Sequence, residues 1–384
     1  MNAHPEAVIG RKTAVGLTAA FALLVAFPAA HQLVRDLGRT GRWSALRLFR
    51  QAPTHASLKE FENALARDSE LGTLARTAYQ TLLARALREG NDKVLVGRDG
   101  FLFFRKEVEM AAGPGFLSRR AGPRRGSDDG ERTLSDPVGA IADYHRQLKA
   151  RGIRLVFVPI PAKPFIYPER VWPGTPGPAW NRDRDLFRSK LAQAGVDVLD
   201  VTDELWRAKE TGEVFLRSDT HWTPLGLGAA ADRIADHLRP MLSGTGTGVL
   251  PSRSVPVTNG GDLLRMMDLW PGASPFKPET VEPTQVTAPA GDDAPVLLLG
   301  DSFTNIYSRK ELEWGEGAGL AEQLALLLGR PVQALALNGG GATAVRQLLS
   351  RKPALLARKR VVLWACSARD LFDESVAWEL VPLP

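Results

Sequence analysis

Apolar runs and amphipathic stretches alternate along the chain beyond residue 150. Continuous apolar runs of strand length predict buried strands at 153–160, 196–200, 296–300, 332–337 and 361–365. Stretches with a helical spacing of apolar residues predict helices near 181–194, 223–242, 318–328 and 342–350. Strands that alternate with helices form a parallel sheet with both faces covered, so the pattern predicts an α/β fold.

The first strongly apolar segment lies near the N-terminus. Residues 13–30 (TAVGLTAAFALLVAFPAA) carry no charge, follow Arg11 and Lys12, and are long enough to cross a bilayer as a helix. A cleaved signal peptide and a retained anchor both fit this pattern. Cleavage after Ala30 would place Pro28 at the minus-three position, where a small residue is needed, so we favour the retained anchor.

Helical and hairpin patterns fill the region between this segment and the α/β part. Residues 32–50 predict a basic amphipathic helix, and residues 57–89 predict one or two helices that Gly90 stops. Residues 94–104 (VLVGRDGFLFF) hold two apolar runs around Asp99-Gly100, a dipeptide that favours a tight hairpin turn.

Less regular stretches complete the predicted organisation. Residues 111–134 predict an exposed loop, after which Ser135 is expected to cap a helix that runs to Ala150. The expected parts are a cytoplasmic tail (1–12), a transmembrane anchor (13–30), a helical stalk or collar (31–92), and an α/β domain (93–384) with a Pro- and Gly-rich insertion (243–294).

Composition narrows the classes of function. With 44% hydrophobic and 24% charged residues, the chain can form one sizeable core. A single cysteine, Cys366, excludes an intramolecular disulfide framework. The net charge of +6 fits an acidic glycan or phospholipid partner as well as an ordinary solvated surface. Because histidines and cysteines lack metal-ligand spacing and the glycines match no nucleotide motif, we expect no metal, cofactor or nucleic-acid partner.

A serine follows one of the predicted strands directly. In LLLGDSFT (297–304), the strand ends at Gly300 and places Ser302 at the carboxyl end of the sheet, where ligands bind in open α/β folds. Gly300 would allow a tight turn that lifts the hydroxyl out of the core. This position predicts a nucleophilic serine, and an ordinary helix cap is the alternative.

A histidine with a nearby carboxylate supplies the base that such a serine needs. In SDTHWT (218–223), Asp219 lies two residues before His221, so in an extended chain both side chains point to one side. Asp219 would then hold the ring edge remote from Ser302 and stabilise the imidazolium. The aromatic neighbour Trp222 could stack on a sugar ring or pack in the core.

Glycines after the predicted strand 332–337 offer free backbone amides. Gly339 or Gly340 is expected to bind an oxyanion together with the amide of Ser302, and Asn338 is a possible third donor. With these parts, Ser302 could attack an acyl carbonyl and carry the acyl group as a covalent intermediate.

Four segments together resemble the alginate O-acetyltransferase family of SGNH-hydrolase-like proteins. They are GRDGFLFF, SDTHWTPLGLGAAA, LLLGDSFT and the segment from Trp364 to Arg369, and the resemblance spans roughly residues 94 to 370. Ordinary SGNH esterases carry Asp-x-x-His near the carboxyl end, but residues 368–371 contain no histidine, which favours the acetyltransferase branch.

The resemblance implies a flavodoxin-like parallel sheet and a triad of Ser302, His221 and Asp219, with Arg369 lining the site. It also implies a single-pass inner-membrane protein with a periplasmic catalytic domain, a polysaccharide acceptor, and a multi-pass membrane-bound O-acyltransferase as the acetyl source. Two alternatives remain open: a carbohydrate acetyl-esterase, and a non-catalytic scaffold that binds polysaccharide.

Overall fold

The computed structural model describes residues 10–40, 52–117, 136–242, 244, 248–288, 291–372 and 378–383. It divides the chain into two compact units, Met1–Leu87 with Asp268–Ala273, and Arg88–Met267 with Ser274–Pro384. The larger unit contains the predicted α/β part of the chain.

The smaller unit is helical. Helix α1 (Arg11–Thr40) has a mean hydropathy of 1.9 over its most apolar window, and it is long and apolar enough to cross a membrane. Helices α2 (His55–Asp68) and α3 (Glu70–Ala86) follow, and Ser69 caps α3 by accepting a hydrogen bond from the amide of Gly72. The prediction of one or two helices over 57–89 is confirmed, whereas part of the helix predicted over 32–50 lies outside the described residues.

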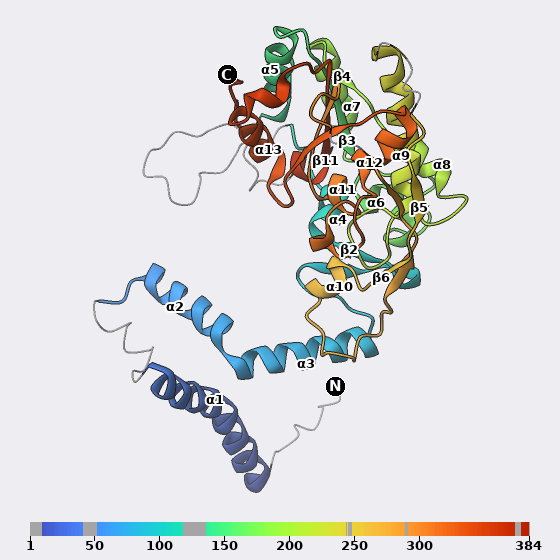
Figure 1. The fold of residues 1–384 in the computed structure, drawn as a ribbon. Coiled ribbons are helices and arrows are strands. Elements are labelled where there is room, and N and C mark those ends of the chain that lie inside the picture. Colours follow the sequence, from blue (N-terminus) through green and yellow to red (C-terminus); the bar gives the residue numbers. More distant parts are fainter. Residues whose placement is uncertain are drawn as a thin grey trace, which may run out of the picture. The chain divides into compact units, whose positions relative to one another are not determined.

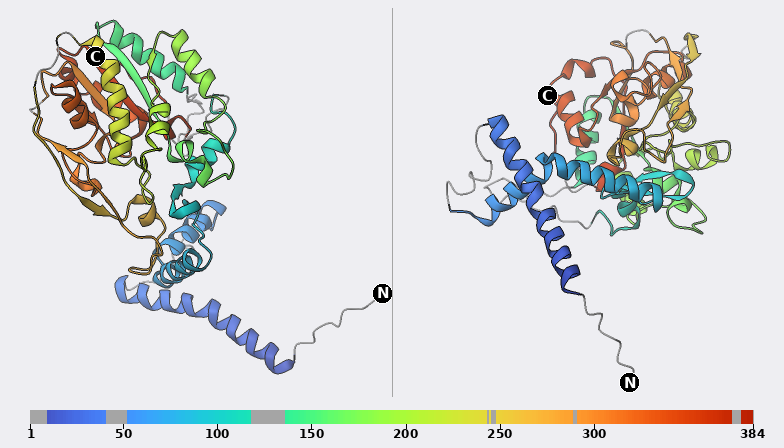
Figure 2. Two further views of the ribbon diagram at one scale, coloured as in Figure 1. Left: turned by 90° about the vertical axis from the view of Figure 1, so that its right-hand side faces the viewer. Right: turned by 90° about the horizontal axis from the view of Figure 1, so that it is seen from below.

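A five-stranded parallel sheet organises the larger unit (Figure 1). Its order is β10 (Gln333–Ala336), β9 (Val296–Gly300), β11 (Val361–Ser367), β3 (Arg154–Ile160) and β4 (Asp197–Val198). The central strand β11 pairs with β3 on one side and β9 on the other, and Figure 2 shows β3 (green) and β11 (red) side by side. The predicted parallel α/β sheet is therefore confirmed.

Apolar side chains on alternate strand positions bury both faces of this sheet. Val156, Leu298 and Leu363 belong to a cluster with helices α8 (Thr202–Ala208), α9 (Pro224–Leu238) and α12 (Leu320–Leu328). Their neighbours Phe157, Leu299 and Trp364 belong to a second cluster with α5 (Pro137–Lys149), α7 (Arg184–Gln193) and α13 (Gly341–Ser350). These packed layers fix the carboxyl ends of the strands, where the candidate residues lie.

The hairpin before the sheet forms as predicted. Strands β1 (Val94–Val96) and β2 (Leu102–Phe104) pair antiparallel, and Asp99 and Gly100 adopt positive φ angles of 54° and 79° in the turn. Helix α4 (Arg105–Ala112), which the sequence pattern did not reveal, follows β2 directly. Helix α5 begins at Pro137 with Asp136 as its N-cap, while the predicted cap Ser135 and most of the predicted loop 111–134 lie outside the described residues.

The insertion contains two short antiparallel ribbons and a helix. Strand β5 (Ser252–Ser254) pairs with β8 (Thr284–Val286), and β6 (Val257–Asn259) pairs with β7 (Glu279–Val281). Helix α10 (Asp262–Met266) lies between β6 and β7 along the chain. A three-residue strand has too few positions to show an alternation of apolar and polar residues, so the sequence pattern did not predict these strands.

Candidate active site

Ser302 lies at the carboxyl end of β9, as the first residue of the short helix α11 (Ser302–Asn305). Asp301 fixes this turn with both carboxylate oxygens. Oδ1 accepts a hydrogen bond from the amide of Phe303 at 2.8 Å, and Oδ2 accepts one from the amide of Ser367 in β11 at 2.9 Å. Burial raises the pKa of Asp301, and these two bonds act against that rise.

The glycine before this turn is needed for a reason that differs from the predicted one. Gly300 is not among the described glycines with a positive φ angle. A Cβ atom at Gly300 would instead collide with Thr304 Oγ1 and lie 2.7 Å from Thr304 Cβ. The missing side chain therefore lets α11 pack against the end of β9, and the conformational freedom of glycine is not the cause.

His221 lies beside the serine. Its Nε2 atom is 2.8 Å from Ser302 Oγ, within hydrogen-bond reach. The loop that carries His221 closes through a bridge between Phe215 and Trp222, and the amide of Leu216 donates to the His221 carbonyl at 3.0 Å. The folded loop thus replaces the extended segment that we expected around His221.

Within this loop, Asp219 contacts His221 through two hydrogen bonds. Asp219 Oδ1 accepts from the backbone amide of His221 at 3.0 Å and lies 2.6 Å from His221 Nδ1. The second bond assigns the Nδ1 proton to the Asp219 side and leaves Nε2 facing Ser302. The structure therefore brings the three predicted residues together in the order serine, imidazole, carboxylate.

Two residues that the sequence analysis missed hold the other oxygen of Asp219. Asp219 Oδ2 accepts from the Trp314 indole and from the backbone amide of Asp262, each at 2.9 Å. Burial alone would raise the pKa of Asp219, but the charge and hydrogen bond of His221 and the Trp314 bond lower it overall. Burial alone would lower the pKa of His221, but Asp219 raises it above its usual 6.5.

A second carboxylate lies beside the pair. Asp262 accepts hydrogen bonds from the Thr220 amide at 2.7 Å and the Thr220 hydroxyl at 2.6 Å, and burial together with the charge of Asp219 raises its pKa. Asp219, His221 and Asp262 place one potential ligand atom each within 4.8 Å of one another. Because hydrogen bonds within the loop already use these atoms, the donors suit a catalytic dyad better than a metal, and the absence of a metal remains a prediction.

The glycine loop after β10 lies next to the serine turn, since Ala336 pairs with Gly300 and the Leu337 amide donates to the Gly300 carbonyl at 3.1 Å. The amide of Gly340 donates to the Leu337 carbonyl at 3.3 Å, so it is already used in a turn, and we correct its predicted role as an oxyanion donor. Across the described residues, the amides of Ser302 and Gly339 have no protein acceptor. These two amides remain the candidate oxyanion donors.

Asn338 has an oriented side chain. Asn305 in α11 donates from Nδ2 to Asn338 Oδ1 at 2.9 Å. Because Oδ1 of Asn338 faces Asn305, its Nδ2 atom points away from Asn305. Asn338 is exposed, so its own Nδ2 remains open to a ligand. Its predicted part as a third donor therefore stays a proposal with geometric support.

Arg369 is half-buried and forms an ion pair with a buried carboxylate. It lies at the start of α14 (Arg369–Phe372), and its Nε and Nη2 atoms are 3.0 and 2.5 Å from Oε1 of the fully buried Glu107 in α4. Its guanidinium also lies 4.8 Å from the Phe104 ring. The charge of Arg369 acts to lower the pKa of both His221 and Asp301, which places it at the border of the site. Substrate contact by Arg369 stays a prediction.

Trp222 packs in the core, which contradicts its predicted part in substrate binding. The residue is 0% exposed, and its ring meets Phe303 at a centroid distance of 5.4 Å in a T-shaped arrangement. Tyr307 donates to the Trp222 carbonyl at 2.8 Å. Trp222 has no exposed ring face, so it cannot stack on a sugar. Its ring instead packs against Phe303, the residue that follows Ser302.

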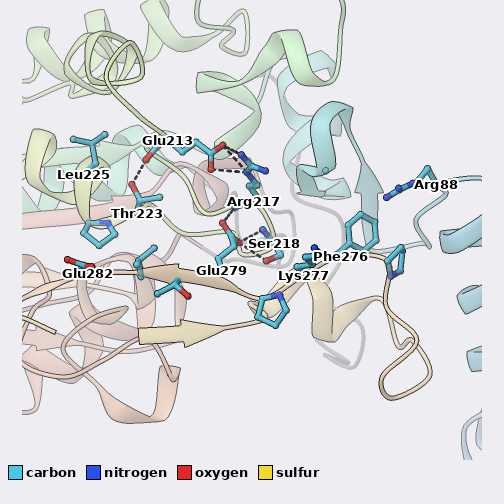
Figure 3. A pocket seen from close by; sticks show the side chains of 16 residues that line it. Arg88, Glu213, Arg217, Ser218, Thr223, Leu225, Phe276, Lys277, Glu279 and Glu282 are labelled. Atoms are coloured by element: carbon cyan, nitrogen blue, oxygen red, sulfur yellow. Dashed lines mark hydrogen bonds and ion pairs between the residues drawn. The ribbon is translucent and has the colours of Figure 1, made fainter. Parts of the chain in front are cut away.

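A cavity of about 710 Å³ borders the segment that precedes Asp219 (Figure 3). Arg217 and Ser218 line it, together with Glu213 and Glu279, whereas Ser302 does not. Glu213 pairs with Arg217, and Glu279 accepts from the backbone amides of Arg217 and Ser218 at 2.8 Å each. These contacts fix the chain immediately before Asp219.

Comparison with known proteins agrees with this geometry. Residues 94–368 match the family model described as "SGNH hydrolase-like domain, acetyltransferase AlgX". The "Probable alginate O-acetylase AlgJ" of Pseudomonas aeruginosa is 28% identical over 242 residues, covering 62% of this chain and 57% of that protein. The protein of the same name from Azotobacter vinelandii is 29% identical over 237 residues, covering 56% of this chain and 55% of that protein.

The match therefore spans little more than half the length of these relatives. Among solved structures, the O-acetyltransferase domain of Pseudomonas putida AlgJ superposes with a TM-score of 0.53 at 24% identity, covering 72% of this chain and 91% of that domain. This likeness supports the SGNH-hydrolase-like fold. Because the family model covers well over half of the sequence, the chain belongs to the family of SGNH hydrolase-like domains of the acetyltransferase AlgX type.

Proposed function

We propose that this chain is a serine-dependent O-acetyltransferase that moves acetyl groups onto hydroxyls of an exported polysaccharide. One observation carries the proposal: Ser302 Oγ lies 2.8 Å from His221 Nε2, while His221 Nδ1 lies 2.6 Å from the buried Asp219. A hydroxyl, a base and an orienting carboxylate in this order are the parts that acyl transfer through a covalent intermediate requires.

In the first step, His221 Nε2 accepts the proton of Ser302 as Oγ attacks the acetyl carbonyl. Asp219 holds the imidazole and stabilises its protonated form. The negative charge that develops on the carbonyl oxygen meets the amides of Ser302 and Gly339, with the Asn338 side chain as a further donor. The tetrahedral intermediate collapses, the leaving group takes the proton from His221, and acetyl-Ser302 remains.

In the second step, a sugar hydroxyl replaces the leaving group. His221 removes its proton, the oxygen attacks the acetyl-serine carbonyl, and Ser302 regains its proton as the ester forms on the sugar. Water can follow the same route, so the position of the acceptor decides between transfer and hydrolysis. The relatives' name, alginate O-acetylase, supports alginate or a similar exopolysaccharide as the acceptor.

The proposed location follows from the apolar helix and the family. We place α1 across the inner membrane as a single span, with residues 1–12 in the cytoplasm, 31–92 as a stalk, and 93–384 as a periplasmic catalytic domain. A membrane-bound O-acyltransferase would supply acetyl at the outer face. The length and hydropathy of α1 support the membrane span, and the family of the larger unit supports a periplasmic catalytic domain.

Acceptor-dependent kinetics test the proposal. Full-length protein in detergent is given p-nitrophenyl acetate with and without a polymannuronate oligosaccharide. We expect Ser302→Ala to abolish nitrophenol release and the oligosaccharide to accelerate it with acetyl appearing on the sugar. Ser308→Ala is the matched control, because Ser308 Oγ donates to Glu322 at 2.6 Å and away from the triad. A rate of nitrophenol release that does not change when the oligosaccharide is added would identify an esterase. Full activity in Ser302→Ala would exclude serine chemistry.

A further inference from the structure

Lys163 is a buried cation that the proposed mechanism does not use. It is the first residue of α6 (Lys163–Ile166), just beyond the carboxyl end of β3, and it is 0% exposed. Its Nζ atom donates to the Leu102 carbonyl at 2.7 Å and the Arg217 carbonyl at 3.2 Å. Burying an ammonium group is costly, so its surroundings must compensate the charge.

One of these bonds reaches the loop that carries the triad residues. The Arg217 carbonyl accepts from Lys163 and also from the Leu102 amide at 2.8 Å. On the opposite side of the same segment, Glu279 accepts from the amides of Arg217 and Ser218 (Figure 3). A cation on the carbonyl and a carboxylate on the amides therefore hold the chain just before Asp219.

Four carboxylates surround this cation at longer range. Burial lowers the pKa of Lys163 to about 8, and the charges of Asp262, Asp219, Glu279 and Glu107 act to raise it. They come from α10, the triad loop, β7 and α4. No salt bridge to Lys163 is found in the described part of the chain, so its charge is shared among all four.

We propose that Lys163 is a positioning residue for the triad: it holds the Asp219–His221 loop through the Arg217 carbonyl, and its positive charge compensates the negative charge of the carboxylates around that loop. The effect of Lys163 on turnover rests on the proposed function. The effect of Lys163 on the His221 pKa is independent of that function, because the imidazole titrates in the folded protein whether or not acetyl is transferred.

The charge of Lys163 predicts the direction in which the pKa of His221 changes when Lys163 is replaced. The groups that act on His221 are Asp219 and Asp262, which favour the imidazolium, and Arg369, which opposes it. Lys163 interacts with the charges of both Asp262 and Asp219, so removing its charge leaves these carboxylates less compensated. This favours the imidazolium further, so the pKa of His221 rises. Since catalysis needs the neutral ring, the acid limb of activity moves to higher pH.

The test compares Lys163→Met with Lys359→Met in the full-length protein. Lys359 is also a buried lysine, 6% exposed, and it donates to the Asp292 carbonyl at 2.9 Å. It lies just before the amino end of β11, whereas Lys163 follows the carboxyl end of β3. The His221 titration is followed by NMR and assigned with His221→Gln, beside thermal unfolding and the pH dependence of p-nitrophenyl acetate hydrolysis.

We expect Lys163→Met to raise the His221 midpoint by roughly one pH unit and to move the acid limb equally, with kcat more affected than KM. Lys359→Met should leave both midpoints in place. Lys163→Gln, which keeps a donor but lacks the charge, should reproduce the shift. An unchanged His221 midpoint in both neutral variants would overturn the proposal, as would loss of folding in both while Lys359→Met folds. Absent turnover in wild-type protein, with the NMR shift present, would instead contradict the proposed function.

Discussion

The Trp314 indole donates a hydrogen bond to Asp219 Oδ2 at 2.9 Å, although Trp314 follows the serine in the chain and Asp219 precedes it. The Asp262 amide, from the insertion, reaches the same oxygen at 2.9 Å. Oδ1 is then left to His221 alone, through the ring and the backbone amide. The carboxylate is thus fixed by segments on both sides of Ser302, which keeps the imidazole aligned with the hydroxyl.

Replacing Trp314 by Phe tests this support. Trp314→Phe removes one donor from a buried carboxylate, and we expect about a tenfold lower kcat/KM for ester hydrolysis together with roughly 1–3 kcal/mol of lost stability. Trp222→Phe is the matched control, because Trp222 is equally buried and its Nε1 has no hydrogen-bond partner among the residues that the structure describes. Equal loss of activity in the two variants would contradict a specific effect of the Trp314 hydrogen bond.

The pH dependence of activity follows from the charge of Asp219. Asp219 raises the pKa of His221 above 6.5, and catalysis needs the neutral ring, so the acid limb of kcat/KM should have its midpoint above that pH. In Asp219→Asn the imidazolium loses its anion, so the midpoint should move to lower pH while kcat falls. Ester hydrolysis measured across pH decides this, and a shift to higher pH in the Asn variant would refute the assignment.

Gly261 allows two segments of the site to approach closely. Its φ angle is 80°, and a Cβ atom there would collide with the Ser218 carbonyl oxygen and lie 2.9 Å from Asp219 Cβ. We expect Gly261→Ala to displace α10 and Asp219, lowering both the thermal midpoint and kcat. Gly100→Ala carries the same φ strain, at 79°, in open space. If both variants lose stability equally and Gly261→Ala keeps its kcat, the close approach is irrelevant to the site.

Asn338 tests the oxyanion geometry. If its Nδ2 donates to the developing negative charge, Asn338→Ala should lower kcat by about 10²- to 10³-fold with little change in KM. Asn305→Ala leaves that donor present but removes the bond that orients it, so a smaller loss is expected. Steady-state ester kinetics compare the two. Wild-type kcat in Asn338→Ala would remove this residue from the site.

Much of the fold could be predicted because its strands are buried on both faces. The continuous apolar run at 296–300 matches β9 residue for residue, and 361–365 identifies all but the last two residues of β11. Strands β5 to β8 were missed because each has only three residues, too few to show an alternating pattern. Local pattern carries no information about such short pairings, which depend on contacts far apart in the chain.

For the site, the sequence motifs identified the reacting groups and missed what holds them. Ser302, His221 and Asp219 stand in motifs beside a strand or a helix start. Trp314 and Lys163 instead reach the loop that carries Asp219 through hydrogen bonds formed only in the folded chain. For Trp222 the sequence left sugar stacking and core packing open, because a position next to His221 gives no information about burial, and the structure shows the packed alternative.

The acetyl-serine intermediate tests the central claim most directly. Full-length protein is mixed with p-nitrophenyl acetate, quenched in acid within the first turnovers, and digested for peptide mass spectrometry. The account predicts one acetyl group on the peptide that contains Ser302, strongly reduced in His221→Ala and absent in Ser302→Ala. Continued ester turnover with no acetyl on Ser302 would contradict it.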